Sequence, residues 1–111
     1  MTAPRLATAT LVPALLRLAE REGGFAVIVV RGDPVSGTVL LQMLEKGRFF
    51  GLFEPGPPIA GAAGWHLAGP AEEDSLAPYL GRRKKVDPDL WIVELDVPDV
   101  QRFISALPGA S

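Results

Sequence analysis

The chain has 111 residues, 48% of them hydrophobic and 22% charged, with no cysteine and a net charge of −2 at pH 7. This length fits one domain, and the composition excludes disorder over most of it. The missing cysteines exclude disulfides and thiol chemistry, and the slight negative charge argues against a general binder of nucleic acid or anionic membranes. We interpret residues 1–10 as a flexible N-terminal tail and residues 11–108 as a single domain.

The N-terminal residues predict neither a secretory signal nor a membrane span. The apolar run between Arg5 and Arg17 is interrupted by Pro13 and continues directly into a charged helix. A signal peptide needs a cleaner apolar stretch followed by a small-residue cleavage site, and a membrane helix needs about 18 apolar residues. We therefore expect a cytoplasmic protein that does not contact membranes.

The first half of the domain predicts one helix followed by three strands. The helix, residues 13–22, places leucines on one face, with Pro13 in its first turn. Residues 25–31 are apolar on both faces and rich in β-branched side chains, which is typical of a buried central strand. Strands over residues 38–44 and 48–53 follow, each after a turn, so we expect the three strands to form an antiparallel meander.

The middle of the chain is rich in glycine and proline. Eight of the 17 residues from 54 to 70 are Gly or Pro, and residues 55–71 carry no charged side chain. Loops of this length are uncommon within a domain and are usually functional or mobile. We expect a mobile loop over residues 55–70 that is dispensable for folding, with a short edge strand at residues 65–67.

The last third predicts a helix over residues 75–84, a strand over residues 90–97 and a helix over residues 99–107. Pro78 is tolerated in the first turn of the first of these helices. In the strand, Trp91 alternates with other apolar residues, so we interpret its ring as part of the core.

Together these elements predict an α+β fold, in which about three helices pack on an antiparallel sheet of four to five strands. One helix layer covers only one face of a sheet, whereas residues 25–31 and 38–44 are apolar on both faces. The mean hydropathy, +0.23, is high for so small a chain. We therefore expect a homodimer in which the open face binds a second copy, with another protein partner as the alternative.

Two blocks of the sequence resemble a known bacterial family. The first block comprises ALLR at 14–17, GGFAV at 23–27, VRGDP at 30–34 and GTVL at 37–40, and the second is VDPDLWIVELD at 86–96. In these blocks the chain resembles the family called domain of unknown function 1491, found mainly in alphaproteobacteria. The resemblance covers about residues 12–97. It implies a cytoplasmic single-domain protein with no assigned activity, and it supplies no catalytic residues.

The carboxylates of Asp87 and Asp89 are the most suggestive pair in the sequence. Pro88 favours an extended Asp87, so both side chains could lie on one side, about 6.6 Å apart. Such a pair could serve acid–base catalysis or bind a hard cation. Turn chemistry explains the same residues, and we favour it. Arg31 and Asp33, at the end of a strand and the start of a turn, are further interaction candidates, in which any ion pair is first of all structural.

Four consecutive cations, Arg82, Arg83, Lys84 and Lys85, end the helix over residues 75–84. Clustered charge of this kind could contact the phosphates of RNA or of a nucleotide. The same residues complement the negative end of the helix dipole, which is the interpretation we favour. The sequence therefore does not predict a nucleic-acid partner.

No catalytic or cofactor motif is complete in the sequence. His66 is the only histidine, and without cysteine it cannot form a recognisable zinc site. The serines lack the G-x-S-x-G pattern of hydrolases, and residues 61–64 lack the Lys-Ser/Thr of a phosphate loop. We expect a non-enzymatic interaction module with no metal and no cofactor. Two alternatives stay open: an RNA- or nucleotide-contacting protein using residues 82–85, and a small enzyme or cation binder using Asp87 and Asp89.

Overall fold

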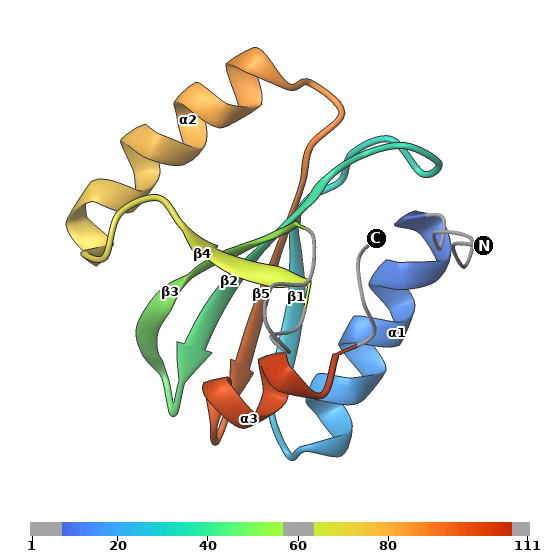
Figure 1. Cartoon of the computed structure of the whole chain (residues 1–111), viewed down its shortest axis with the longest axis vertical. Coiled ribbons are helices and arrows are strands. Elements are labelled where there is room, and N and C mark those ends of the chain that lie inside the picture. The colour runs from blue at the N-terminus through green and yellow to red at the C-terminus, as the bar shows by residue number, and fades with distance from the viewer. Residues whose placement is uncertain (1–7, 57–63, 108–111) are drawn as a thin grey trace.

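In the part of the chain that the structure describes, five strands form one sheet and three α-helices pack around it (Figure 1). The computed structural model describes residues 8–56 and 64–107. The elements in chain order are α1 (Thr8–Arg21), β1 (Phe25–Val30), β2 (Val39–Glu45), β3 (Arg48–Pro55), β4 (Trp65–Ala68), the 3₁₀ turn η1 (Glu73–Ser75), α2 (Leu76–Val86), β5 (Trp91–Val97) and α3 (Val100–Ser105). The α+β class, the strand number and the three helices expected from the sequence are confirmed.

The strand order is β1-β5-β2-β3-β4, so the expected meander is wrong. β5 lies between β1 and β2, antiparallel to the first and parallel to the second, and only β2 and β3 form the expected hairpin. Lys46 and Gly47 form the two-residue turn of this hairpin with φ values of 51° and 82°, as a type I′ turn requires. β5 is an interior strand whose apolar residues are mostly buried on the face covered by α1 and α3, whereas Glu94 and Asp96 are half-buried on the opposite face.

The expectation of a buried central strand at residues 25–31 is also wrong. β1 is an edge strand, and its exposed and half-buried residues alternate. Ala26 and Ile28 pack against the core below α1. Phe25, Val27 and Val29 point away from it and are 72%, 53% and 50% exposed. The strand is apolar on both sides, but the structure covers only one of them.

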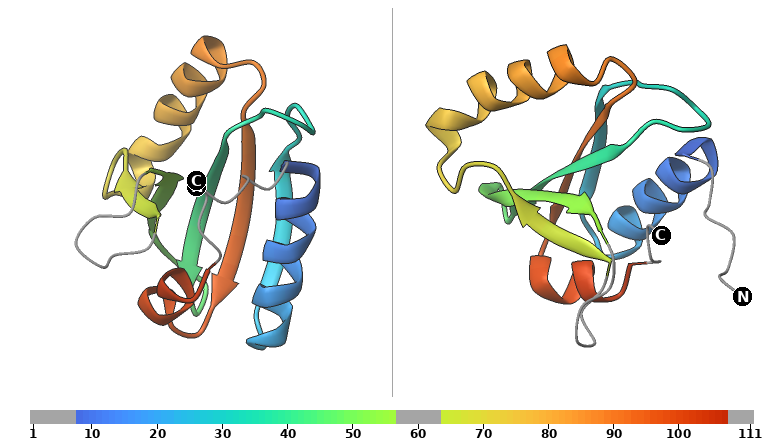
Figure 2. Two further views of the ribbon diagram at one scale, coloured as in Figure 1. Left: turned by 45° about the vertical axis from the view of Figure 1, so that its right-hand side comes forward. Right: turned by 45° about the horizontal axis from the view of Figure 1, so that its top comes forward.

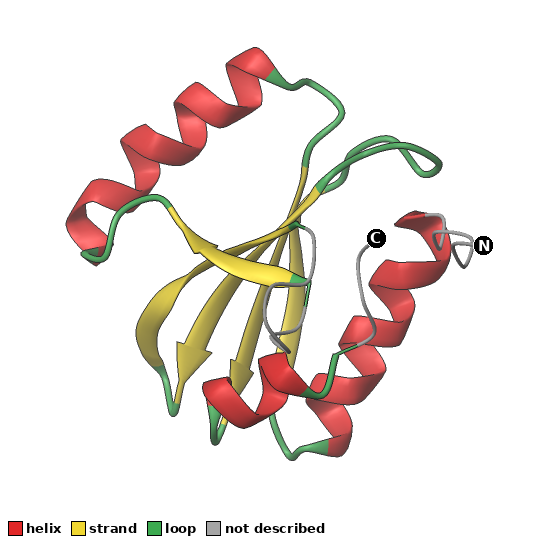
Figure 3. Ribbon diagram, in the orientation of Figure 1, coloured by secondary structure: helices red, strands yellow, loops and turns green. Residues whose placement is uncertain are grey.

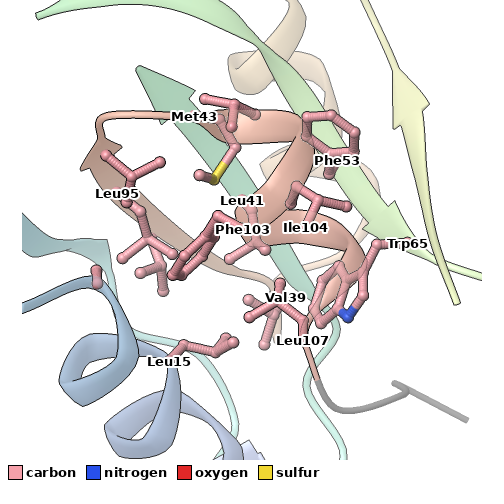
Figure 4. Close-up of a cluster of buried hydrophobic side chains, with 14 of the residues drawn as sticks. Leu15, Val39, Leu41, Met43, Phe53, Trp65, Leu95, Phe103, Ile104 and Leu107 are labelled. Atoms are coloured by element: carbon pink, nitrogen blue, oxygen red, sulfur yellow. The ribbon is translucent and has the colours of Figure 1, made fainter. Parts of the chain in front are cut away.

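The two faces of the sheet carry cores of unequal size. α1 and α3 cover one face, where residues such as Leu15, Leu41 and Phe103 form the main hydrophobic cluster (Figure 4). α2 lies over the other face (Figure 2), where Leu40, Leu90 and Ile92 form a small cluster with the half-buried Val30 and Leu80. We call these the α1/α3 face and the α2 face.

α1 begins at Thr8, five residues earlier than expected, so residues 8–10 belong to the helix and not to a tail. The Thr8 hydroxyl donates to the Gly37 carbonyl over 2.6 Å, and the Ala9 N–H donates to the Pro34 carbonyl over 2.7 Å. These bonds hold the first turn, and Pro13 consequently lies in the interior of the helix and not in its first turn. Residues 1–7, the rest of the expected tail, lie outside the described residues.

The segment over residues 55–70 is paired at both ends. β3 continues to Pro55, which pairs with Trp65 of β4, and the Gly56 N–H donates to the Gly64 carbonyl over 2.8 Å. The expected edge strand is thus confirmed as β4. Trp65 is 4% exposed and belongs to the main core, which corrects its assignment to a dispensable loop. The expectation of mobility concerns residues 57–63, which lie outside the described residues.

The elements of the last third agree closely with those expected. α2 places Pro78 in its first turn and ends at Asp87, and β5 buries Trp91 with the alternating apolar residues of its face. α3 is capped by Asp99, whose carboxylate accepts a hydrogen bond from the Arg102 N–H over 3.1 Å. Local patterning predicted these elements well because each has a clear start and stop signal.

The position of Trp65 gives the first testable prediction. Trp65→Ala removes a buried ring from the main core and should lower the free energy of unfolding by about 3–5 kcal/mol. Leu67→Ala, two residues along the same strand at a side chain that is 67% exposed, is the control and should change it by less than about 0.5 kcal/mol. Urea denaturation measures both. Equal effects of the two substitutions would contradict the placement of Trp65 in the core.

Candidate functional site

Two loops meet at one end of the sheet, the β1–β2 loop (residues 31–38) and the α2–β5 loop (residues 87–90) (Figure 3). The Asp33 N–H donates to the Asp89 carbonyl over 3.0 Å. The Asp89 carbonyl also lies so close to Gly32 and Gly37 that a Cβ at either glycine would collide with it. Glycine is therefore required at both positions for this approach. We call this contact the loop junction.

Trp91 connects the loop junction to the core. Its ring is 3% exposed, and its indole Nε1–H donates to the Asp33 carbonyl over 2.7 Å. The Arg31 guanidinium lies over the ring, 5.3 Å from its centroid, as a cation–π contact. The interpretation of Trp91 as a core residue is confirmed. In the described part of the chain Arg31 forms no ion pair with either Asp33 or Asp87.

The Asp33 carboxylate organises the β1–β2 loop. Its Oδ1 accepts hydrogen bonds from the Val35 and Ser36 N–H groups, both over 2.8 Å, and from the Ser36 hydroxyl over 3.2 Å. The backbone bonds from Ser36 and then Val35 lower the pKa of Asp33 below its ordinary value of 3.8, since they favour the charged carboxylate. The contacts of Asp33 are those of a turn-forming residue.

Asp87 and Asp89 hold different positions in the α2–β5 loop. Asp87 is the C-terminal cap residue of α2, and its Oδ1 accepts from the Asp89 N–H over 3.1 Å. The Asp89 side chain is exposed, and among the described residues it has no hydrogen-bond or ion-pair partner. No group of three or more His, Cys, Asp or Glu residues in the described ranges could hold a metal ion. These contacts support turn chemistry for the pair.

The basic run at the end of α2 is divided by Arg83. Its Nη1 donates to the Tyr79 hydroxyl over 2.7 Å and lies 3.1 Å from Glu54 Oε1 of β3. Partial burial lowers the pKa of the guanidinium, but the contacts with Tyr79 and Glu54 outweigh this and leave the pKa raised. The i, i+4 spacing of Tyr79 and Arg83 is the sequence signal that could have indicated this inward orientation.

Arg82, Lys84 and Lys85 remain exposed on α2. The run therefore offers three solvent-facing cations, while the fourth attaches the helix to the sheet.

From the sequence, residues 25–31 are expected to be apolar on both faces of the sheet, and the structure leaves part of that strand exposed on the α2 face. Phe25 and Val27 of β1, together with the exposed Val29 at the irregularity that follows Ile28, form an apolar row, which we call the β1 row. In register with it on β5 lie two acids, Asp96 opposite Phe25 and Glu94 opposite Val27. The positions of these two acids could have indicated the exposed row from the sequence, because acids on the neighbouring strand show that this part of the face is open to solvent.

The sequence of the whole domain matches one protein family. A sequence model of the family described as protein of unknown function (DUF1491) matches residues 6–105. The chain belongs to the DUF1491 family. This confirms the resemblance drawn from the two sequence blocks.

Solved structures agree with this assignment. A DUF1491 family protein from Caulobacter crescentus CB15, solved by crystallography, is 30% identical with a TM-score of 0.74, and the alignment covers 94% of this chain and 98% of that one. An NMR structure of a DUF1491 family protein from the same organism is also 30% identical with a TM-score of 0.74, over 98% and 100% of the two chains. Protein Atu0922 from A. tumefaciens is 27% identical with a TM-score of 0.70, over 96% and 100%.

No curated protein matches the sequence of this DUF1491 protein. None of the helices within residues 8–56 and 64–107 is long and apolar enough to cross a membrane.

The bonds of Asp33 predict a pH dependence of stability. Folding lowers the pKa of Asp33, so its carboxylate stabilises the folded state at pH values above its ordinary pKa of 3.8. This contribution is lost as the pH falls through the lowered pKa of the folded state. Asp33→Asn should therefore lower the urea midpoint at pH 7, and the gap to the unsubstituted protein should narrow toward pH 3. Glu73→Gln, at an exposed acid before α2, controls for the loss of one charge. A gap that is independent of pH would contradict the role given to the carboxylate.

The unequal contacts of Asp87 and Asp89 give a further prediction. Asp87→Asn should lower the free energy of unfolding by up to about 1 kcal/mol, because its carboxylate accepts a backbone bond. Asp89→Asn should change it by less than about 0.5 kcal/mol. Unfolding free energies of the two variants and of the double variant test this. A stabilised double variant would instead indicate two repelling carboxylates that await a cation.

Proposed function

We propose that this DUF1491 protein is a non-enzymatic interaction module that forms a homodimer with the β1 row at the contact. The exposure of Phe25, Val27 and Val29 on one face of one strand carries the proposal. Exposed apolar surface costs about 25 cal/mol per Å², so a contiguous row of this kind favours association. In this proposal the module acts in the bacterial cytoplasm, as the resemblance implied.

A second copy is the partner that the fold favours. In a dimer with two-fold symmetry both molecules use the same surface, so each molecule covers the exposed row of the other. A standard interface buries about a tenth of a small protein's surface on each side, which here is roughly a tenth of 6655 Å². In the proposed dimer the β1 row supplies the apolar part of such an area, because α2 leaves the row uncovered.

The two alternative functions have weaker support. With Arg83 bound to Glu54 and Tyr79, an RNA- or nucleotide-contacting surface on α2 retains three cations on a protein of net charge −2. A salt-dependent mobility shift with short RNA would favour that alternative over a purely protein-binding module. An enzyme or cation binder using Asp87 and Asp89 is tested by the double Asn variant described above.

The proposal predicts that the protein sediments as a dimer. Sedimentation equilibrium at micromolar concentration should show a species of twice 11.8 kDa. The double variant Phe25→Thr/Val27→Thr should dissociate it, since it removes the apolar row and keeps residues that favour strands.

The matched control is Val35→Thr/Leu67→Thr, at side chains that are 73% and 67% exposed but lie outside the row. This variant should remain dimeric. Only an 11.8 kDa species for the unsubstituted protein at every concentration, or equal dissociation of both double variants, would contradict the proposal.

A further inference from the structure

We infer that the β1 row of one copy binds the exposed side of α2 from the second copy, with Lys84 and Lys85 facing Glu94. This inference rests on the proposed dimer and names the two surfaces that meet in it. One surface is apolar with acids beside it, and the other is basic with an apolar residue beside it.

The acidic surface lies along β1 and β5. Glu94 and Asp96 are cross-strand partners of Val27 and Phe25, so their side chains lie on the same face as the β1 row. Glu94 Oε1 accepts from Gln42 Nε2 and Asp96 Oδ1 accepts from the Gly47 N–H, each over 3.1 Å. Each carboxylate has about four acceptor sites, so most of this capacity remains for another donor.

Neither acid is neutralised within the described ranges, where no ion pair to Glu94 or Asp96 occurs. A hollow of about 230 Å³ adjoins the row, and its lining includes Phe25, Lys46 and Asp96. The surface therefore combines exposed apolar groups, unneutralised acids and a depression in which a further apolar side chain can pack.

The basic surface is the outward side of α2. The helix is held to the sheet by the buried Leu76, by Leu80 and by the Arg83–Glu54 ion pair. Its remaining surface is exposed and includes the cations Arg82, Lys84 and Lys85. Val86 follows them directly and is 85% exposed. Lys84 and Val86, two residues apart, lie on opposite flanks of the helix, with Lys85 between them on the outward side. This surface is therefore basic, with one exposed apolar residue at one flank.

The alternative of direct β1–β1 pairing has less support. The pairing of β1 with β5 shifts register between Ile28 and Val30, and an irregularity of this kind hinders the addition of another strand at an edge. Pairing two β1 strands would also bring Glu94 and Asp96 of both copies to one sheet face, with Lys46 as a cation beside each Asp96. Opposite charges across an interface favour the correct partner, and like charges oppose it.

Charge reversal tests the arrangement. Glu94→Lys alone and Lys84→Glu/Lys85→Glu alone should each weaken the dimer by about tenfold or more at low salt, because each places like charges face to face. The chain that carries all three substitutions should recover most of the affinity, since the charges are then exchanged between the surfaces. The dissociation constant of the unsubstituted dimer should rise with NaCl concentration.

The control reverses two exposed acids at the other end of α2, Glu72→Lys/Glu73→Lys, and should leave the dissociation constant unchanged. Circular dichroism and melting temperatures confirm that each variant is folded. If the β1-row variant dissociates the dimer but no charge reversal affects it, or if the triple variant recovers nothing, this inference is overturned and the proposed dimer stands. If the unsubstituted protein is monomeric throughout, the proposed function itself is overturned.

Discussion

The loop junction determines the topology of the sheet. The Asp33 N–H binds the Asp89 carbonyl, and the chain between Asp89 and Trp91 enters the sheet directly beside this bond. The Trp91 N–H donates to the Thr38 carbonyl over 2.8 Å, which starts the parallel pairing of β5 with β2. β5 is thereby guided between β1 and β2.

The position of β5 in turn accounts for the unusual surface of β1. An interior strand has a neighbouring strand on each side, and β5 occupies such a place between β1 and β2, with most of its residues buried. β1 is displaced to the edge, where α1 covers Ala26 and Ile28 but nothing in the described part of the chain covers Phe25 or Val27. The exposed row is thus a consequence of the junction and not an isolated feature of β1.

Local sequence patterns predicted the elements better than their arrangement. The alternation in β5 and the position of Pro78 in α2 depend on neighbouring residues, and each was recognisable. The insertion of β5 depends on a bond between residues 33 and 89, and no local pattern encodes such a contact. For the same reason Trp65 was placed in a loop, since its burial comes from packing against a distant part of the core.

The sequence predicted the turn roles of the aspartates but not the inward contacts of Arg83. Asp33, Asp87 and Arg83 each form bonds within the chain, and those bonds shape turns or attach α2. What remains exposed is an apolar row beside acids on β1 and β5, and cations beside an apolar residue on α2. Such extended surfaces of opposite charge fit a macromolecular partner better than a small ligand, because they are open and not enclosed.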